Sequence, residues 1–417
     1  MKVMEDSIQQ NINNPAELER LYRNSPAQFE TAFLHLYPSV AHYPVAETWR
    51  QRLTYQKSSS FNWGSSHEIR WVLLLAFVSG CIAKLPFWFN WSTEEFFTRN
   101  IPFVVFPTLL VYFAIKKEVS IRQLVLPALL IVFAAVYVNL IPYYSISQTG
   151  QLSSVHLLFF LWTLAGFIFA GASVKKPRGT IQYLQHNGNW LVISAIMVLS
   201  AMLFTAISVA LFEVIGINLA TFYQKYVLVW ALAAFPMIAT YLVLNNPQLV
   251  NRISPLIAGI FTPIVLCTLF VFLLALAFSS KNIYTDRNFL MIFNLVLVGV
   301  MAIIFFSLTS SRQHHRSILH YLQTILSVVA VVANGIALSA IIFRVSSFGF
   351  TPNRVAVLGA NLLIFLHLAF LSYQLVKSLR LNTSTLKVEA AIVGWFPVYS
   401  IWAAIVVFLF PFIFSFG

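Results

Sequence analysis

Five polar residues of this sequence are predicted to share one level, near the ends of long apolar segments. They are Lys84, Glu213, Arg344, Thr351 and Arg354. Opposite charges at such a level either neutralise one another in an ion pair or form a site for a lipid headgroup or a polar solute. Arg354 stands in the first turn of a predicted helix, where a cation is unfavourable. We therefore expect Glu213 to pair directly with Arg344 or Arg354.

Two further polar residues, Asn334 and His367, fall near the middle of two consecutive apolar segments. Consecutive membrane helices run antiparallel, so these side chains are expected to meet at the membrane midplane. The pair is interpreted either as a hydrogen bond between helices or as a titrating gate, because histidine changes its charge near neutral pH. No carboxylate is predicted at this depth, where ion-coupled transporters commonly place one.

The elements that must position these residues are eleven apolar runs, and a membrane-crossing helix needs roughly 20 such residues. Hydrophobic residues make up 59% of the 417 residues and charged residues only 9%, which excludes an ordinary soluble domain. The predicted fold is an all-α, polytopic transmembrane helix bundle. Its second run, 101–115, is short and is predicted to be tilted or re-entrant. The predicted spans are 71–89, 101–115, 124–144, 155–171, 190–216, 226–244, 255–278, 289–308, 322–343, 355–376 and 390–414.

The charges predict the orientation of these spans. The formal net charge of +13 comes from 26 Lys and Arg against 13 Asp and Glu. Most of these cations cluster in short loops on the side that holds the N-terminus. Because Lys and Arg stay on the cytoplasmic side during insertion, the N-terminus is predicted inside and the C-terminus outside. The clustering beside the spans makes the lipid bilayer the expected partner and excludes nucleic acid.

The chain is predicted to begin with a small domain. Residues 1–60 are expected to form a cytoplasmic helical module, residues 61–70 a linker, and residues 71–417 the transmembrane domain. Ser25 followed by Pro26 is typical of a helix start, and three short helices are expected. About 60 residues give a marginal independent core. The module is interpreted either as a plain prefix of the membrane domain or as a docking site for a cytoplasmic protein.

The sequence lacks the phosphate-binding, metal-binding and nucleophile motifs that would indicate an enzyme. His314, His315 and His320 lie in or beside one predicted loop, without acidic or thiol neighbours at metal-ligand spacing. Cys81 and Cys267 lie in separate apolar runs and predict no disulfide framework. We expect no cofactor, no metal site and no catalytic residues.

One segment resembles a known family. Residues 344–354 read RVSSFGFTPNR and are similar to the Arg…Tyr-Gly-Leu-Thr-x-x-Arg signature of a family of uncharacterised bacterial multi-pass inner-membrane proteins. Arg344, Gly349, Thr351 and Arg354 match, whereas Phe348 and Phe350 replace the family's Tyr and Leu. The resemblance covers roughly the C-terminal half of the chain. It implies a location in the bacterial inner membrane and supplies no activity.

Three functions stay open at this point. A non-enzymatic transporter or channel for a small solute or lipid is preferred, and it predicts a water-accessible cavity that reaches Asn334 and His367. A membrane scaffold or sensor predicts a solid bundle whose N-terminal module docks a cytoplasmic partner. A lipid-modifying enzyme predicts a lateral opening beside Glu213 and Arg354.

Overall fold

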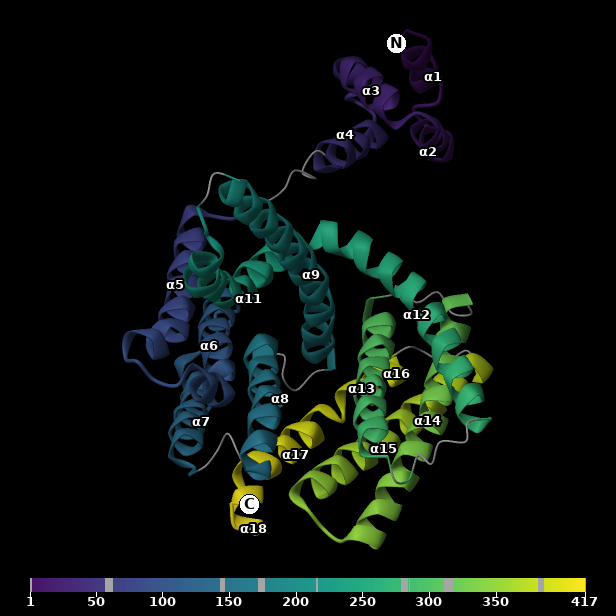
Figure 1. The fold of residues 1–417 in the computed structure, drawn as a ribbon. Coiled ribbons are helices and arrows are strands. Elements are labelled where there is room, and N and C mark those ends of the chain that lie inside the picture. Colours follow the sequence, from purple (N-terminus) through teal and green to yellow (C-terminus); the bar gives the residue numbers. More distant parts are fainter. Residues whose placement is uncertain are drawn as a thin grey trace. The chain divides into compact units, whose positions relative to one another are not determined.

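The computed structural model describes residues 2–56, 63–142, 147–171, 177–214, 217–278, 284, 286–310, 318–381 and 386–416. These residues form helices and no strands, which confirms the all-α prediction (Figure 1). The chain divides into two compact units, Met1–Asn62 and Trp63–Gly417.

The N-terminal unit contains four described helices, one more than predicted. They are α1 (Lys2–Gln10), α2 (Pro15–Asn24), α3 (Pro26–Val40) and α4 (Pro44–Gln56). A proline opens each of the last three, since its missing amide proton would have no partner at a helix start. Their shared core consists of Ile8, Ile12, Leu18, Phe29, Ala32, Phe33, Val40, Ala46, Trp49 and Leu53. The apolar faces therefore do meet, as the sequence predicts.

The second unit contains eleven described helical segments that are long and apolar enough to cross a membrane, so the chain is a multi-pass membrane protein. Its helices are α5 (Ser66–Trp88), α6 (Thr93–Lys116), α7 (Ile121–Leu140), α8 (Gln148–Ala170), α9 (Pro177–Val214), α10 (Ala220–Phe222), α11 (Leu228–Asn245), α12 (Pro247–Ala277), α13 (Arg287–Ser310), α14 (Ile318–Phe348), α15 (Pro352–Leu381), α16 (Leu386–Val393), α17 (Phe396–Phe408) and α18 (Phe410–Ile413). A π-helical turn, Tyr223–Val227, joins α10 to α11.

Two predicted boundaries are wrong. The second span is not short, because α6 begins at Thr93 and its 24 residues suffice to cross a bilayer. The linker predicted at 61–70 is partly helical, because Ser65 caps α5 by accepting a hydrogen bond from the Glu68 amide.

Two large apolar cores hold the transmembrane helices together. One joins α5, α6, α8, α9 and α11, and the other joins α12 to α16 with the first turns of α9. Leu184 of α9 packs against both cores. Phe396 at the start of α17 belongs to the first core, whereas Ala403 and Val407 further along α17 pack with α7 and α8. Tyr399 of α17 packs against the second core, so helices α9 and α17 connect the two groups.

Glycines let aromatic rings approach the helix backbones closely. A Cβ placed on Gly80 would lie 2.0 Å from the Trp230 ring, and one on Gly359 would lie 2.1 Å from the Trp402 ring. Real Cβ atoms do not tolerate such distances. The close packing of α5 on α11 and of α15 on α17 therefore requires glycine, which has no Cβ, at positions 80 and 359.

Candidate functional site

A buried titratable side chain, His367, lies near the centre of the tenth span. His367 lies about 15 residues, or roughly 22 Å, from either end of α15. Its side chain is fully buried. Its Nδ1 lies 3.0 Å from the Tyr399 hydroxyl of α17, and its Nε2 lies 3.1 Å from the Ala391 carbonyl oxygen of α16. The sequence predicts the position of His367 near the middle of its helix but does not predict these partners.

Aromatic rings enclose the same imidazole. The indole of Trp395 stacks on it with an interplanar angle of 8° and a centroid distance of 5.2 Å. The ring of Phe305, from α13, lies 5.0 Å away. The Tyr399 hydroxyl lies 3.7 Å from the Met301 sulfur of α13. We call His367, Tyr399, Met301, Trp395 and Phe305 the His367 cluster.

The His367 cluster lies beside a break in the eleventh span. Helix α16 ends at Val393 and α17 begins at Phe396, with Gly394 and Trp395 between them. Pro397 has no amide proton to donate to the Val393 carbonyl, which explains why the helix does not continue. The last carbonyls of a helix lack partners within it, and His367 approaches one of them, that of Ala391. Irregular backbone at membrane depth is tolerated where protein groups or a cavity satisfy it.

Asn334 does not hydrogen-bond to His367, so the hydrogen bond predicted between them is wrong. Asn334 is fully buried in α14, and its Nδ2 donates to the Asn361 Oδ1 of α15 at 3.4 Å. Asn361 in turn donates to the Val357 carbonyl. The Asn334 Oδ1 has no hydrogen-bond partner among the described residues. The interhelical hydrogen bond expected of Asn334 therefore exists, but its partner is an asparagine.

Both Asn334 and His367 are 0% exposed. No water-sized cavity touches either side chain in this conformation, so the cavity predicted from the sequence is absent here.

The five residues predicted to share one level do not form a single site through their described contacts. Glu213 is exposed and forms no ion pair with Arg344 or Arg354, all three of which are described. The predicted direct pairing is therefore wrong. The Arg354 guanidinium instead donates to the carbonyls of Phe348 and Gly349, at 2.6 and 2.8 Å.

Arg354 thus binds the C-terminal end of α14. That end carries the negative pole of the helix dipole, so it compensates the cation that the start of α15 disfavours. Thr351 accepts the Arg354 amide and caps α15 as expected. Gly349 has φ +78°, a left-handed conformation that suits the turn between the two helices. This part of the predicted site acts as a structural turn.

Lys84 is buried at the far end of α5. Its ammonium donates to the Lys225 carbonyl in the π-helical turn. It also lies 4.3 and 4.5 Å from the ring centroids of Phe87 and Tyr226. No described acidic side chain pairs with it. Contacts with aromatic faces stabilise the cation, and they tie α5 to the start of the α10–α11 segment.

A charged network at the opposite end of α5 was not predicted from the sequence. The Glu68 Oε1 accepts from the Tyr112 hydroxyl at 2.7 Å, from the Lys116 ammonium at 2.6 Å and from the Asn245 amide at 3.1 Å. The Tyr241 hydroxyl nearby is buried and has no hydrogen-bond partner among the residues that the structure describes. The start of α5 therefore lies with the ends of α6 and α11, as alternating spans require. The spacing Ser65-Ser66-His67-Glu68 is a capping pattern that signals this helix start.

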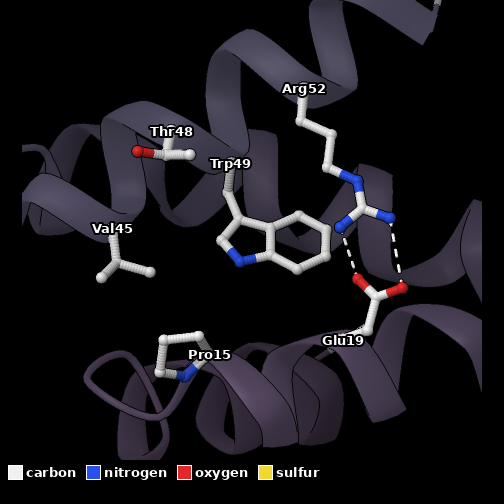
Figure 2. Close-up of a pocket in the computed structure, with 6 residues that line it drawn as sticks. All are labelled: Pro15, Glu19, Val45, Thr48, Trp49 and Arg52. Atoms are coloured by element: carbon white, nitrogen blue, oxygen red, sulfur yellow. Dashed lines mark hydrogen bonds and ion pairs between the residues drawn. The ribbon is translucent and has the colours of Figure 1, made fainter.

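The N-terminal unit has a small cavity of about 270 Å³ between α2 and α4, lined by Pro15, Glu19, Val45, Thr48, Trp49 and Arg52 (Figure 2). Figure 2 shows Arg52 and Glu19 joined by two contacts beside Trp49. The Arg52 guanidinium also lies 4.5 Å from the Trp49 ring. The pKa of the Glu19 carboxyl is lowered to about 2, mainly by the hydrogen bond from Arg52 and to a smaller extent by the one from Arg23.

No metal-binding group of His, Cys, Asp or Glu occurs among the described residues. His314 and His315 lie outside these residues. His320 is buried at the start of α14.

Models of known protein families, curated proteins and solved structures all gave no match to this chain. The resemblance noted in residues 344–354 therefore stays a prediction.

Proposed function

We propose that this chain is a non-enzymatic transporter for a small solute or lipid in the bacterial inner membrane, with its N-terminus in the cytoplasm. The observation that carries the proposal is the broken eleventh span beside the buried side chain of His367. Interrupted helices near the bilayer centre are typical of transporter substrate sites, because the freed backbone groups and nearby side chains provide polar contacts.

The proposal requires a second conformation. In the described one the side chains of His367 and Asn334 are fully buried, as expected of an occluded state. Two features favour movement of the eleventh span. The α16–α17 junction lacks continuous helical hydrogen bonding. Both helices contact α15, but α16 also packs against α9 whereas α17 packs mainly against α8. Alternating access commonly moves one group of helices against another around a central site.

Thiol labelling tests this proposal without knowledge of the substrate. In a chain whose Cys81 and Cys267 are replaced by alanine, Asn334→Cys is compared with Ala333→Cys. Both positions are 0% exposed, and only the first belongs to the polar midplane. A transporter predicts that a water-soluble thiol reagent modifies the cysteine at 334 faster, from one or both sides of sealed vesicles. Equal, negligible labelling of the two variants from both sides would refute transport through this region.

A second function is favoured by a different observation. The N-terminal unit has its own core and its own cavity, so it has the means to dock a cytoplasmic protein as a scaffold or sensor would. The test places a photo-crosslinking amino acid at Thr48, which is exposed on the rim of the cavity, in the full chain within native membranes. Ala41, exposed but not lining the cavity, is the control position. A specific adduct at 48 and none at 41 is expected, and identical patterns would reject docking at the cavity.

A further inference from the structure

The hydrogen bonds around His367 suit a histidine that carries one proton or two. The Ala391 carbonyl can only accept, so the Nε2 that faces it must hold a proton. That requirement excludes the neutral tautomer protonated at Nδ1 alone. Two forms are left: the neutral Nε2–H imidazole and the doubly protonated imidazolium.

The Tyr399 hydroxyl fits both forms because it has two partners. It lies 3.0 Å from the His367 Nδ1 and 3.7 Å from the Met301 sulfur. When Nδ1 is bare, the hydroxyl donates its proton to that nitrogen. When Nδ1 is protonated, the hydroxyl oxygen accepts from Nδ1–H and its own proton turns to the sulfur, a weak acceptor. One hydroxyl rotation therefore exchanges the two hydrogen-bonding patterns.

We infer that His367 is a proton-binding site at the membrane midplane, with Tyr399 and Met301 as the groups that adapt to its protonation. Uptake adds one proton from water to Nδ1 and one positive charge to the ring, and Tyr399 keeps its own proton throughout. The face of Trp395, stacked at a centroid distance of 5.2 Å, would stabilise a cationic ring, and the tilted ring of Phe305 lies 5.0 Å away. Desolvation opposes the charge, and the Ala391 carbonyl and the Tyr399 hydroxyl act against that effect as hydrogen-bond acceptors.

The surroundings contain no other described group that would take the proton. From α13 the imidazole meets Phe305, from α16 the Ala391 carbonyl, from the break Trp395 and from α17 Tyr399. Tyr399 is the titratable side chain among these contacts. Helices α8 and α14 also pack against α15. In the described part of the chain they make no hydrogen bond or ring contact with His367, and no ion pair includes it.

The proposed transport function gives this proton a role as the coupling ion, and that role rests on the proposed function. The protonation itself does not. Protonation of Nδ1 would strengthen the hydrogen bond from the His367 Nε2–H to the Ala391 carbonyl, and so bias the break toward the conformation described here.

The experiment is a pH titration of ¹⁵N-histidine-labelled full-length protein in lipid, by solid-state NMR. Subtraction of the His367→Gln spectrum assigns the signals. Between about pH 9 and pH 4, the range in which protein histidines titrate, the Nδ1 signal should change from a bare to a protonated nitrogen, while Nε2 stays protonated. A His367 signal that shows Nδ1–H with a bare Nε2, or that does not titrate, overturns the inference.

Met301→Leu is the selective variant, because it removes the sulfur acceptor that only the charged form uses and nearly conserves volume. It should lower the proton affinity of His367 about three- to tenfold, the effect of one weak hydrogen bond, with an unchanged spectrum of the neutral form. Met291→Leu, on the exposed face of the same helix, is the control and should change nothing. Equal proton affinities in the two variants would refute the role of Met301. A titrating His367 in a protein whose cysteine at 334 stays unlabelled refutes transport and leaves the proton site standing.

Discussion

Replacement of Gly359 by alanine is expected to destabilise the transmembrane unit, because the new methyl group has no room. A Cβ on Gly359 would lie 2.1 Å from two carbons of the Trp402 ring. Overpacking of this kind costs about 1–3 kcal/mol, and the better helix propensity of alanine offsets up to about 1 kcal/mol of it. We therefore expect the free energy of unfolding to fall by about 1–2 kcal/mol.

Gly299→Ala is the matched control for this change. Gly299 also lies in a transmembrane helix, α13, and a Cβ there would have nothing within 4 Å. Denaturation of each purified variant in the same detergent, followed by circular dichroism, measures the difference. Trp402→Leu should relieve most of the penalty of Gly359→Ala, so the double-mutant cycle should show favourable coupling. If Gly359→Ala and Gly299→Ala are equally stable, the close approach of α15 and α17 is wrong.

Three further outcomes are expected. The free energy of unfolding should fall by about 1 kcal/mol in Lys116→Met and in Glu68→Gln, because the ion pair is only partly exposed. A double-mutant cycle should show a coupling of about 0.5–1 kcal/mol between the two changes, and strictly additive effects would contradict the network. The pKa of the Glu19 carboxyl is lowered from 4.5 to about 2, so this group should stabilise the N-terminal unit above about pH 4.5 and lose that effect as the pH falls toward 2. A ¹³C carboxyl titration, assigned with Glu19→Gln, should find the low midpoint, and an ordinary midpoint would contradict the pairing with Arg52. Compartment reporters inserted at Asn90 and at Glu118, the turns at either end of α6, should report opposite sides of the membrane, with Glu118 in the cytoplasm; the same side for both would show that α6 does not cross.

The lengths of the apolar segments were sufficient to predict the number of spans. The start of α6 was predicted too late, because its first residues include charged side chains. The segment from Thr93 to Asn100 contains two glutamates and Arg99, so its hydropathy suggests a loop. In the structure the Arg99 guanidinium is buried, and it donates to the carbonyls of Val138 and Ile141 at the end of α7. It also pairs with Glu95. A cation that satisfies the open carbonyls of a neighbouring helix can be buried, and a single sequence does not show that neighbour.

The positions of the buried polar residues along their helices were predictable from the sequence, whereas their hydrogen-bond partners were not. Position along a helix follows from counting residues, which placed Asn334 and His367 correctly near the middle of α14 and α15. Partners depend on how each helix is rotated and on which distant segment packs against it. Tyr399 lies 32 residues from His367 in the sequence, and the Met301 sulfur comes from a helix still further away. The predicted pairing of Glu213 with an arginine was wrong for the same reason, because two residues at the same level of the membrane can lie far apart within it.

The break in the eleventh span and the buried histidine explain each other physically. An interrupted helix in lipid leaves carbonyls without partners, which costs several kcal/mol per group, and a histidine buried at this depth needs acceptors for its N–H groups. The contact between His367 Nε2 and the Ala391 carbonyl meets both needs at once. Trp395, in the break itself, covers one face of the ring. Because the same residues stabilise the break and surround the site of protonation, a change in charge at His367 acts directly on the conformation of the junction between α16 and α17.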